Sequence, residues 1–345
     1  MSLFSNYLAL WYQKNKRDLP WRNTNNPYHI WLSEVILQQT RVEQGLPYFQ
    51  RFKQNYPTIH DLANASEQAV LNDWQGLGYY SRARNLHNTA KIISDLGAFP
   101  NNYADLLQLK GIGPYTAAAV ASFAFKEKKA VVDGNVYRVL SRYFGIELPI
   151  YSTQGKKHFQ ELADELIPEL NPDLHNQAIM EFGALQCVPK NPNCEICPLI
   201  ETCEAYRTNK IQELPLKSKK TKVKHRFFHY HIKFDVSGKF EFNQRTNKDI
   251  WQGLYEFNLV ELENENEFLK SNSSPFDYIS KTFTHILSHQ RIQSIFFISK
   301  SKNKNESSKN LITLNEISNY PIPRLIEKFL EEHYEILAEI SQKTI

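Results

Sequence analysis

One short stretch of the chain, residues 106–135, limits what it can fold into more than any other. It reads LLQLKGIGPYTAAAVASFAFKEKKAVVDGN. The leucines at its start indicate the end of a short helix, and Pro114 suits the first turn of a second helix that runs to about Phe125. Between the two, Gly111 and Gly113 permit positive φ and a close approach of the backbone to another molecule. The stretch predicts two helices joined by a tight glycine turn.

A glycine turn of this kind directs the unpaired backbone N–H groups of the second helix outward. Those groups suit the binding of an anion, here a nucleic-acid phosphate. An ordinary corner between two helices is the alternative, since a Gly-x-Gly turn alone is a weak signal. The carboxylate of Asp133 and the four cysteines of the chain favour the phosphate-binding interpretation.

The cysteines form one cluster with the spacing C-x6-C-x2-C-x5-C. They are Cys187, Cys194, Cys197 and Cys203. Cysteines this close together in a chain of 345 residues do not make a disulfide framework; they indicate a reduced, cytosolic compartment and a metal site. Four thiolates suit a [4Fe–4S] cluster or tetrahedral zinc. Short zinc modules mostly use paired CxxC units, and the single unit here favours the cluster.

The composition indicates a globular chain with two domains. Its residues are 41% hydrophobic and 23% charged, and 345 residues are enough for two cores. The net charge of +4 is too mild to indicate nucleic-acid binding by itself. No apolar run has the length of a membrane span, and the first residues do not begin a signal peptide.

Basic residues gather between the two expected domains. Residues 207–226 contain eight lysines or arginines against one acid, Glu213. The segment is either a solvated linker or a patch beside a DNA backbone, and the sequence leaves both open. The basic residues are Arg207, Lys210, Lys217, Lys219, Lys220, Lys222, Lys224 and Arg226.

Residues 1–206 have helical apolar spacing and no alternating runs typical of strands. Within an expected helix at residues 28–39, Glu34 shares a face with apolar side chains one turn away on either side. Lost hydration raises the pKa of such a carboxyl, as a general acid near pH 7 requires. A salt-bridged core glutamate is the alternative. The other expected helices cover residues 2–15, 42–54, 66–74, 81–96, 115–125, 135–144, 153–167 and 172–185.

A second glycine-rich turn occupies residues 76–82. We expect Leu77 and Tyr79 to project from it, because rigid apolar side chains on an exposed turn can enter a base stack. Plain packing between two helices is the alternative.

Beyond residue 226 the pattern changes to strands. Apolar and polar residues alternate over residues 228–236, and His229 and His231 are expected on a solvent-facing strand surface. Residues 226–345 thus predict an α+β domain, joined to the helical domain by a linker at 207–225. Further strands are expected at 239–245, 253–260 and 292–300, polar loops at 261–274 and 301–309, and a helix at 323–336.

With these motifs in place, residues 1–204 resemble the MutY family of adenine DNA glycosylases, which belongs with endonuclease III to the helix-hairpin-helix glycosylases. The matching segments are SEVILQQT around Glu34, the glycine turn, VDGN around Asp133, and the cysteine spacing. The resemblance implies an all-α catalytic domain with its active site between two helical subdomains. It also implies that the four cysteines bind a [4Fe–4S] cluster.

By this resemblance, Glu34 matches the acid that protonates a flipped-out adenine at N7 and then activates water. Asp133 matches the carboxylate that stabilises the oxocarbenium-like sugar. Tyr115 and Asn135 match further active-site positions. The positions that match the family's adenine pocket are Arg17, Trp21, Arg22 and Glu181. The positions that match its residues around the lesion pair are Gln39, Thr40, Leu77 and Tyr79. Gly111 and Gly113 match the turn that contacts the DNA backbone.

Tyr115 also separates two sister activities. Bifunctional relatives such as endonuclease III carry a lysine nucleophile at this place, so tyrosine predicts a monofunctional glycosylase. The alternatives are a glycosylase/lyase for oxidised pyrimidines and a non-catalytic, metal-containing protein that recognises damaged DNA.

The segment WQGLYEF at residues 251–257 resembles the Nudix-like C-terminal domain of the same family. The REUxEE core of the Nudix box is absent from the sequence, so we expect no pyrophosphatase activity. In the family, a Phe-Ser-His loop of this domain recognises 8-oxoguanine, and Phe283, Thr284 and His285 are the corresponding place. His289 is either a further loop member or ordinary surface.

The resemblance implies base-excision repair on double-stranded DNA in which adenine is opposite 8-oxoguanine or guanine. It also implies a bacterial-type, cytoplasmic and nucleoid-associated monomer with no membrane partner.

Overall fold

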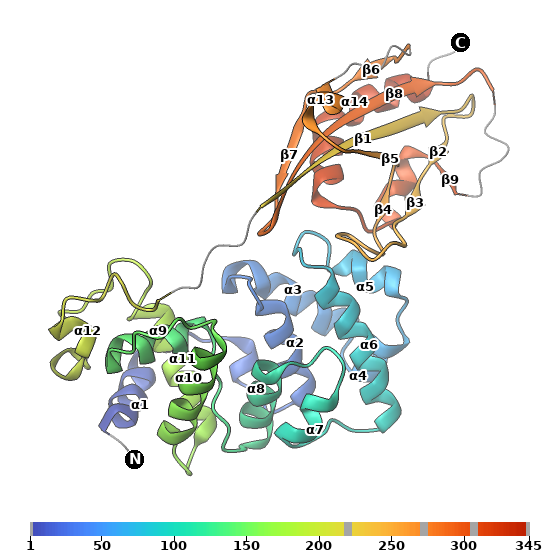
Figure 1. Ribbon diagram of the computed structural model, residues 1–345. Coiled ribbons are helices and arrows are strands. Elements are labelled where there is room, and N and C mark those ends of the chain that lie inside the picture. Colours follow the sequence, from blue (N-terminus) through green and yellow to red (C-terminus); the bar gives the residue numbers. More distant parts are fainter. Residues whose placement is uncertain (1–2, 217–222, 270–274, 304–309, 343–345) are drawn as a thin grey trace. The chain divides into compact units, whose positions relative to one another are not determined.

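The computed structural model describes residues 3–216, 223–269, 275–303 and 310–342 (Figure 1). The chain divides into two compact units. The first combines Met1–Ala63 with Asn88–Lys219, and the second combines Asn64–His87 with Lys220–Ile345.

The first unit is built from helices, as the sequence predicts (Figure 1). Helix α6 (Ser81–Leu96) begins in the second unit and ends in the first. Helix α4 was not among the expected helices. The other elements of the first unit are α1 (Leu3–Asn15), η1 (Pro20–Arg22), α2 (Pro27–Leu37), α3 (Val42–Asn55), α4 (Ile59–Asn64), α7 (Tyr103–Gln108), α8 (Pro114–Phe125), α9 (Gly134–Phe144), α10 (Thr153–Leu166), α11 (Pro172–Leu185), η2 (Ile200–Thr202) and α12 (Glu204–Arg207).

A core of apolar side chains joins α1, α9, α10 and α11. Leu8, Leu140 and Phe159 are fully buried in it, and Phe182 contributes from α11. The ring of Phe182 meets Trp11 edge to face at 5.0 Å between centroids. This packing fixes the positions of α9 and α11. Asp133 lies at the N-terminus of α9, and Glu181 lies within α11.

The expected helix pair around the glycine turn is present as α7 and α8. Gly111 has φ +91°, in the left-handed region that favours glycine. Gly113 has φ −91° and caps α8, so the expectation of positive φ is wrong for this residue. What glycine provides there is space, because a Cβ at position 113 would have no atom within 4 Å.

The second unit holds the strands, together with α5 (Glu67–Asp73) (Figure 1). Its main sheet has the order β5-β1-β8-β6, with β7 also paired to β8. The long strands β1 and β8 are parallel, and β5, β6 and β7 are antiparallel to them. The elements are β1 (Lys224–Phe234), β2 (Phe240–Glu241), β3 (Asn243–Gln244), β4 (Tyr255–Glu256), β5 (Asn258–Leu262), α13 (Glu265–Leu269), β6 (Tyr278–Ile279), β7 (Phe283–Ile286), β8 (Gln290–Lys300), β9 (Leu311–Ile312), η3 (Leu314–Asn319) and α14 (Arg324–Gln342).

Helix α14 packs its apolar stripe against this sheet. The ring of Phe329 stacks on Phe296 of β8, with 3.7 Å between centroids, and packs edge to face on Phe283 of β7. The expected α+β architecture is therefore confirmed, and the helix extends beyond the predicted end at residue 336.

Two expectations for this unit are wrong. His229 does not face solvent: it is 3% exposed, and its Nε2 lies 3.1 Å from Phe268 O of α13. Both faces of β1 are covered: His229 packs against Phe268 of α13, and Phe228 and Tyr230 are fully buried on the opposite face. The alternation of polar residues therefore did not indicate a solvent-facing surface. The expected polar loop at 261–274 contains the end of β5 and helix α13, and its residues 270–274 lie outside the described residues.

Candidate active site

Glu34 lies in α2, a helix whose start is well defined by sequence. Asn26 caps it by accepting a hydrogen bond from Tyr28 N–H, and Pro27 occupies the first turn. Glu34 is 7% exposed. Burial raises its pKa to about 7, although a hydrogen bond from Tyr115 acts in the opposite direction. The side chain thus combines burial with a pKa near neutrality.

Tyr115 reaches Glu34 from the first turn of α8. Its Oη donates a 2.6 Å hydrogen bond to Glu34 Oε2. Glu34 Oε1 accepts no hydrogen bond from the residues that the structure describes, so this oxygen is available to a ligand. The helix pair that presents Gly111 and Gly113 therefore also positions a partner of the buried acid.

Asp133 is the N-cap of α9. Its Oδ1 accepts from the N–H groups of Asn135 and Val136, both at 2.8 Å, and its Oδ2 accepts from Asn135 Nδ2 at 2.7 Å. Burial raises the pKa of Asp133, and these hydrogen bonds, with the charge of Arg138, counteract part of the rise. The capping geometry fixes where this carboxylate points.

Arg138 supports this arrangement, although no role was expected for this residue from the sequence. Its guanidinium donates to Asn135 Oδ1 at 2.9 Å, to Gly183 O at 2.6 Å and to Cys187 O at 2.7 Å. It lies one turn after Asn135 on α9 and is 8% exposed. Asn135 and Arg138 stand three residues apart and so share one helix face, which was the signal available in the sequence.

Glu181 of α11 joins two arginines that are distant in sequence. Arg17 donates to it through Nε and Nη2, and Arg22 through Nη1 and Nη2, at 2.7–3.0 Å. Burial alone would raise the pKa of Glu181, but the hydrogen bonds from Arg22 and Arg17 outweigh it and lower the pKa to about 2. Trp21, between the two arginines in sequence, is buried and packs edge to face on Phe49.

These side chains line one cavity of about 540 Å³ in the first unit, a volume typical of small-molecule sites. Thr40 lies in its wall as well, whereas Gln39 is not among the lining residues and is exposed at φ +56° after α2. The wall also holds Lys126, which forms an ion pair with Asp173. The lining residues that the sequence singled out are Arg17, Trp21, Arg22, Glu34, Thr40, Tyr115, Asp133, Asn135 and Glu181.

The four cysteines line a second cavity of the first unit, beside apolar residues such as Phe182 and Leu199. Arg142, buried at 2% exposure, donates to Cys187 Sγ at 3.4 Å and to two backbone carbonyls after it. Among the described residues, no group of three or more His, Cys, Asp or Glu side chains is arranged to hold a single metal ion. The four cysteines thus gather around one cavity.

The turn at residues 76–82 differs from the expectation. Leu77 does not project into solvent, because it is 5% exposed. Tyr79 does project: it is 44% exposed and has φ +50°, and Arg82 lies over its ring at 5.5 Å. Of the two expected wedge residues, the structure exposes one.

The expected loop of Phe283, Thr284 and His285 is not a loop, because these residues belong to β7. Phe283 is 6% exposed and packs on α14, and His285 packs against Trp251 at 5.6 Å between ring centroids. The similarity to Phe-Ser-His was misleading, because the alternation of buried and exposed residues there is that of a strand. Thr284 alone is exposed.

A two-residue turn follows β7. Leu287 N–H donates to Gln290 O at 2.8 Å, which brackets Ser288 and His289 at the tip of a hairpin with β8. Both tip residues are exposed, and Ser288 Oγ lies 3.1 Å from His289 Nδ1. His289 is therefore a loop member in this structure.

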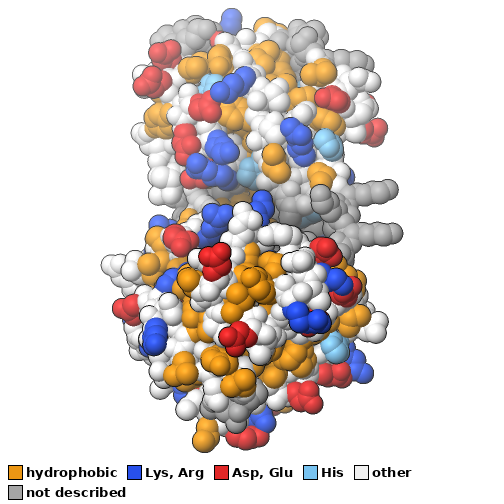
Figure 2. Space-filling view, turned by 90° about the vertical axis from the view of Figure 1, so that its left-hand side faces the viewer, with side chains coloured by type: hydrophobic (Ala, Val, Ile, Leu, Met, Phe, Trp, Pro, Cys, Tyr) orange, Lys and Arg blue, Asp and Glu red, His pale blue; other side chains and the backbone are white. Residues whose placement is uncertain are grey.

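The basic segment between the domains is only partly described, since residues 217–222 lie outside the described residues. Arg207 and Lys210 form ion pairs with Glu204 and Glu147. Arg226 is buried at 6% exposure, so it does not belong to a surface patch. On the face drawn in Figure 2, lysines and arginines are scattered among acidic side chains.

Within the described residues, no helix is long and apolar enough to cross a membrane.

Comparisons with known proteins agree with this geometry. Residues 32–169 match the family described as "HhH-GPD superfamily base excision DNA repair protein", and residues 235–332 match "NUDIX domain". The adenine DNA glycosylase of Buchnera aphidicola subsp. Schizaphis graminum is 34% identical over 341 residues, which cover 95% of this chain and 98% of the relative. That of Buchnera aphidicola subsp. Baizongia pistaciae is 35% identical over 297 residues, 83% of each chain.

Among solved structures, a thermostable thymine-DNA glycosylase is 31% identical, with a TM-score of 0.56, and covers 60% of this chain and 96% of its own. The similarity to the Buchnera enzymes extends over both units and includes the helices that carry the buried acid. The chain therefore belongs to the adenine DNA glycosylases, DNA-repair enzymes of the helix-hairpin-helix superfamily that end in a Nudix-like domain.

Proposed function

We propose that this glycosylase is monofunctional and removes adenine opposite 8-oxoguanine or guanine, after flipping the adenine out of duplex DNA. The observation that carries the proposal is the arrangement around Glu34. A carboxyl with a pKa near 7, a tyrosine that holds one of its oxygens, and a capped aspartate line the same cavity. The cavity is large enough for a nucleobase.

In the proposed reaction, neutral Glu34 donates its proton to N7 of adenine. The glycosidic bond breaks, and its electron pair goes to N9 of the leaving base. The positive charge that develops on the sugar is stabilised by the carboxylate of Asp133. Glu34, now ionised, takes a proton from the water that attacks C1′, so that adenine and an abasic site are released and the acid is restored.

The wall formed by Arg17, Trp21, Arg22 and Glu181 supports adenine binding. Glu181 keeps both guanidinium groups in place, since its low pKa keeps it ionised at neutral pH. Trp21 offers a buried aromatic surface beside them. We propose that these residues orient the flipped base so that N7 faces Glu34.

The monofunctional assignment rests on two residues. Tyr115 stands where bifunctional relatives carry a lysine, and its phenol is hydrogen-bonded to Glu34. Lys126 lines the cavity, but its ammonium is paired with Asp173. A phenol cannot form a Schiff base, and the amine of Lys126 is engaged by Asp173, so neither residue is suited to that step.

We propose that Cys187, Cys194, Cys197 and Cys203 hold a [4Fe–4S] cluster. The shared cavity supports this, because four thiolates around one space suit a cluster that binds each of them on a different iron. The cluster would fasten the loop between α11 and α12. Arg142 would donate to its Cys187 sulfur.

Recognition of 8-oxoguanine is proposed for the exposed end of the β7–β8 hairpin. Phe283 is in the core, so we assign the role to Thr284 and to the turn that contains Ser288 and His289. Ser288 and His289 repeat the Ser-His order of the family's Phe-Ser-His loop, with Leu287 before them. Their hydroxyl and imidazole offer both donors and acceptors to the lesion.

DNA contacts of the first unit are proposed for the turn at Gly111 and Gly113 and for Gln39 and Thr40 beside the cavity. A further contact is proposed for exposed Tyr79 of the second unit. The division into a catalytic domain at 1–206, a linker at 207–225 and a lesion-recognition domain at 226–345 is proposed as the functional one. The protein would act as a monomer on chromosomal DNA of a bacterial-type cytoplasm.

Excision under single-turnover conditions on duplexes with adenine opposite 8-oxoguanine, guanine or thymine tests this function. We expect strand breaks that depend on alkali, restricted to the first two duplexes, and no covalent complex after borohydride treatment. A trapped complex would contradict the monofunctional assignment. Adenine loss opposite thymine as well would contradict the mispair specificity.

Replacing Tyr115 with phenylalanine should move the pH profile of excision upward. The hydrogen bond from Tyr115 lowers the pKa of Glu34, so its loss raises that pKa. Because the acid is active when protonated, the single-turnover rate of the natural protein should fall tenfold per pH unit above about pH 7. In the variant, the same decline should begin at a higher pH. A midpoint that does not move would show that this contact does not tune the acid.

A further inference from the structure

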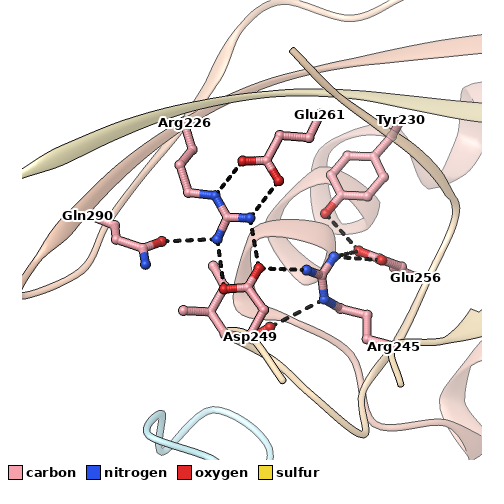
Figure 3. Close-up of polar contacts among 8 residues, drawn as sticks. Arg226, Tyr230, Arg245, Asp249, Glu256, Glu261 and Gln290 are labelled. Atoms are coloured by element: carbon pink, nitrogen blue, oxygen red, sulfur yellow. Dashed lines mark hydrogen bonds and ion pairs between the residues drawn. The ribbon is translucent and has the colours of Figure 1, made fainter. Parts of the chain in front are cut away.

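A network of charged side chains around two buried arginines lies at one end of the main sheet in the second unit (Figure 3). At its centre, Arg226 of β1 uses all five of its N–H donors. Nε and Nη2 donate to the two oxygens of Glu261, and Nη1 and Nη2 donate to those of Asp249, at 2.6–3.0 Å. The fifth donor, on Nη1, meets Gln290 Oε1 at 3.2 Å. The guanidinium is thereby fixed in position and orientation.

The contact with Gln290 leads to the hairpin tip. Gln290 is the first residue of β8, and its carbonyl accepts the hydrogen bond from Leu287 that closes the turn. On the other side, Lys224 N–H donates to His289 O at 3.0 Å, two residues before Arg226 on β1. The turn is thus attached to β1 by one backbone bond and by one side-chain bond to Arg226.

The rest of the network is attached elsewhere. Arg245, 8% exposed on its side chain, donates to Glu256 Oε1 and Oε2 at 2.6 and 2.7 Å and to Asp249 at 3.2 Å. Tyr230 Oη donates to the same Glu256. No hydrogen bond joins Arg245 to Gln290 or to the turn among the described residues. Two buried arginines of one network therefore differ in one respect: Arg226 contacts the base of the hairpin and Arg245 does not.

We propose that Arg226 and Gln290 are positioning residues that hold Ser288 and His289 in the orientation that reads 8-oxoguanine. This rests on the proposed role of the turn. A two-residue turn at the edge of a sheet has few contacts of its own, so the side chains at its base determine where it points. Lysine cannot replace Arg226, since its single nitrogen has three donors for the five oxygen atoms that Arg226 serves, and it lacks the planar fork that binds two carboxylates bidentately.

The test compares four variants by the ratio of single-turnover excision rates for adenine opposite 8-oxoguanine and opposite guanine. Ser288→Ala reports on the tip itself. Arg226→Lys and Gln290→Met remove the proposed link, and Arg245→Lys is the matched control within the same network. Thermal unfolding of each variant measures the purely structural damage.

We expect each of Ser288→Ala, Arg226→Lys and Gln290→Met to lower the ratio by about tenfold. This is the factor by which the loss of one hydrogen bond to the lesion changes the preference for 8-oxoguanine over guanine. For Arg226→Lys and Gln290→Met, the rate opposite guanine should stay within about twofold. Arg245→Lys should lower the unfolding temperature as Arg226→Lys does and leave the ratio unchanged. This pattern separates orientation of the turn from stability of the domain.

Two results would overturn the inference. If Ser288→Ala lowers the ratio but Arg226→Lys and Gln290→Met do not, the turn reads the lesion without this support. If Arg245→Lys lowers it equally, the network acts through stability. No effect of Ser288→Ala would instead refute the proposed role of the turn.

Discussion

Glu34→Gln is expected to abolish adenine excision while leaving binding to the mispair intact. Glutamine has the same shape and keeps an oxygen for Tyr115, but it has no proton to give to N7. A general acid contributes roughly 10²–10⁴-fold to a rate, and this one would act twice, as acid and then as base. We therefore expect a loss of at least about a thousandfold in the single-turnover rate opposite 8-oxoguanine, with a dissociation constant within a few-fold of the natural protein's.

The same substitution should stabilise the protein at alkaline pH, which an ordinary loss of a contact would not do. Burial raises the pKa of Glu34 from 4.5 to about 7, so folding is progressively opposed as pH rises above 4.5, and the penalty is complete above about 7. A shift of this size corresponds to about 3 kcal/mol. Glu34→Gln removes this penalty.

Unfolding temperatures of the two proteins at pH 5 and pH 8 measure this effect. The unfolding temperature of the variant minus that of the natural protein should be several degrees larger at pH 8 than at pH 5. About 1 kcal/mol shifts the unfolding temperature of a domain this size by a few degrees. Equal differences at both pH values would mean that Glu34 is not a buried acid with a raised pKa. Retained excision would refute its catalytic role.

The first unit was largely predictable from sequence because its signals are local. Proline, glycine and capping residues mark where helices begin, and the apolar spacing around Glu34 indicates a buried carboxyl. What the sequence could not show is which distant residues meet. The contacts of Glu181 with Arg17 and Arg22, and of Arg138 with Cys187, depend on the packing of α1, α9 and α11.

The second unit was predictable in class and not in detail. Alternation placed a strand at β1 but could not show that α13 covers the face that carries His229, so this residue was expected in solvent. Phe283, Thr284 and His285 are similar in residue type to the family's Phe-Ser-His loop, but the pairing of β7 with β8 places Phe283 in the core. Only the register of the hairpin shows that Ser288 and His289 form the exposed turn.

Exposure is the property that sequence patterns predict least well in turns. Leu77 and Tyr79 stand two residues apart on the same turn, and both were expected to project from it. The left-handed conformation at Tyr79 directs that ring outward while Leu77 is buried. Such differences arise from a few backbone angles that tertiary contacts determine.

Asp133→Asn separates two roles that one side chain combines. Asparagine is as good an N-cap as aspartate, so its oxygen can still accept from the N–H groups of Asn135 and Val136, and α9 should remain capped. The negative charge is lost, and with it the stabilisation of the sugar cation. Removing one such electrostatic contribution costs about 10²–10³-fold, which is the loss we expect in the single-turnover rate. Asp133→Ala should lose the cap as well and unfold at a lower temperature.

The role of the charge itself is measured with abasic-site analogues. Duplexes that carry a cationic pyrrolidine or a neutral tetrahydrofuran in place of the sugar differ by one positive charge. At pH 6 the natural protein should bind the pyrrolidine duplex more tightly than the tetrahydrofuran duplex, and Asp133→Asn should lose this preference. Glu34→Gln should keep it, because Glu34 of the natural protein is mostly protonated and therefore neutral at this pH, as glutamine is. If Asp133→Asn binds both analogues as the natural protein does, the carboxylate acts by capping α9 and not by stabilising the cation, and the proposed mechanism would need another source of negative charge in the cavity.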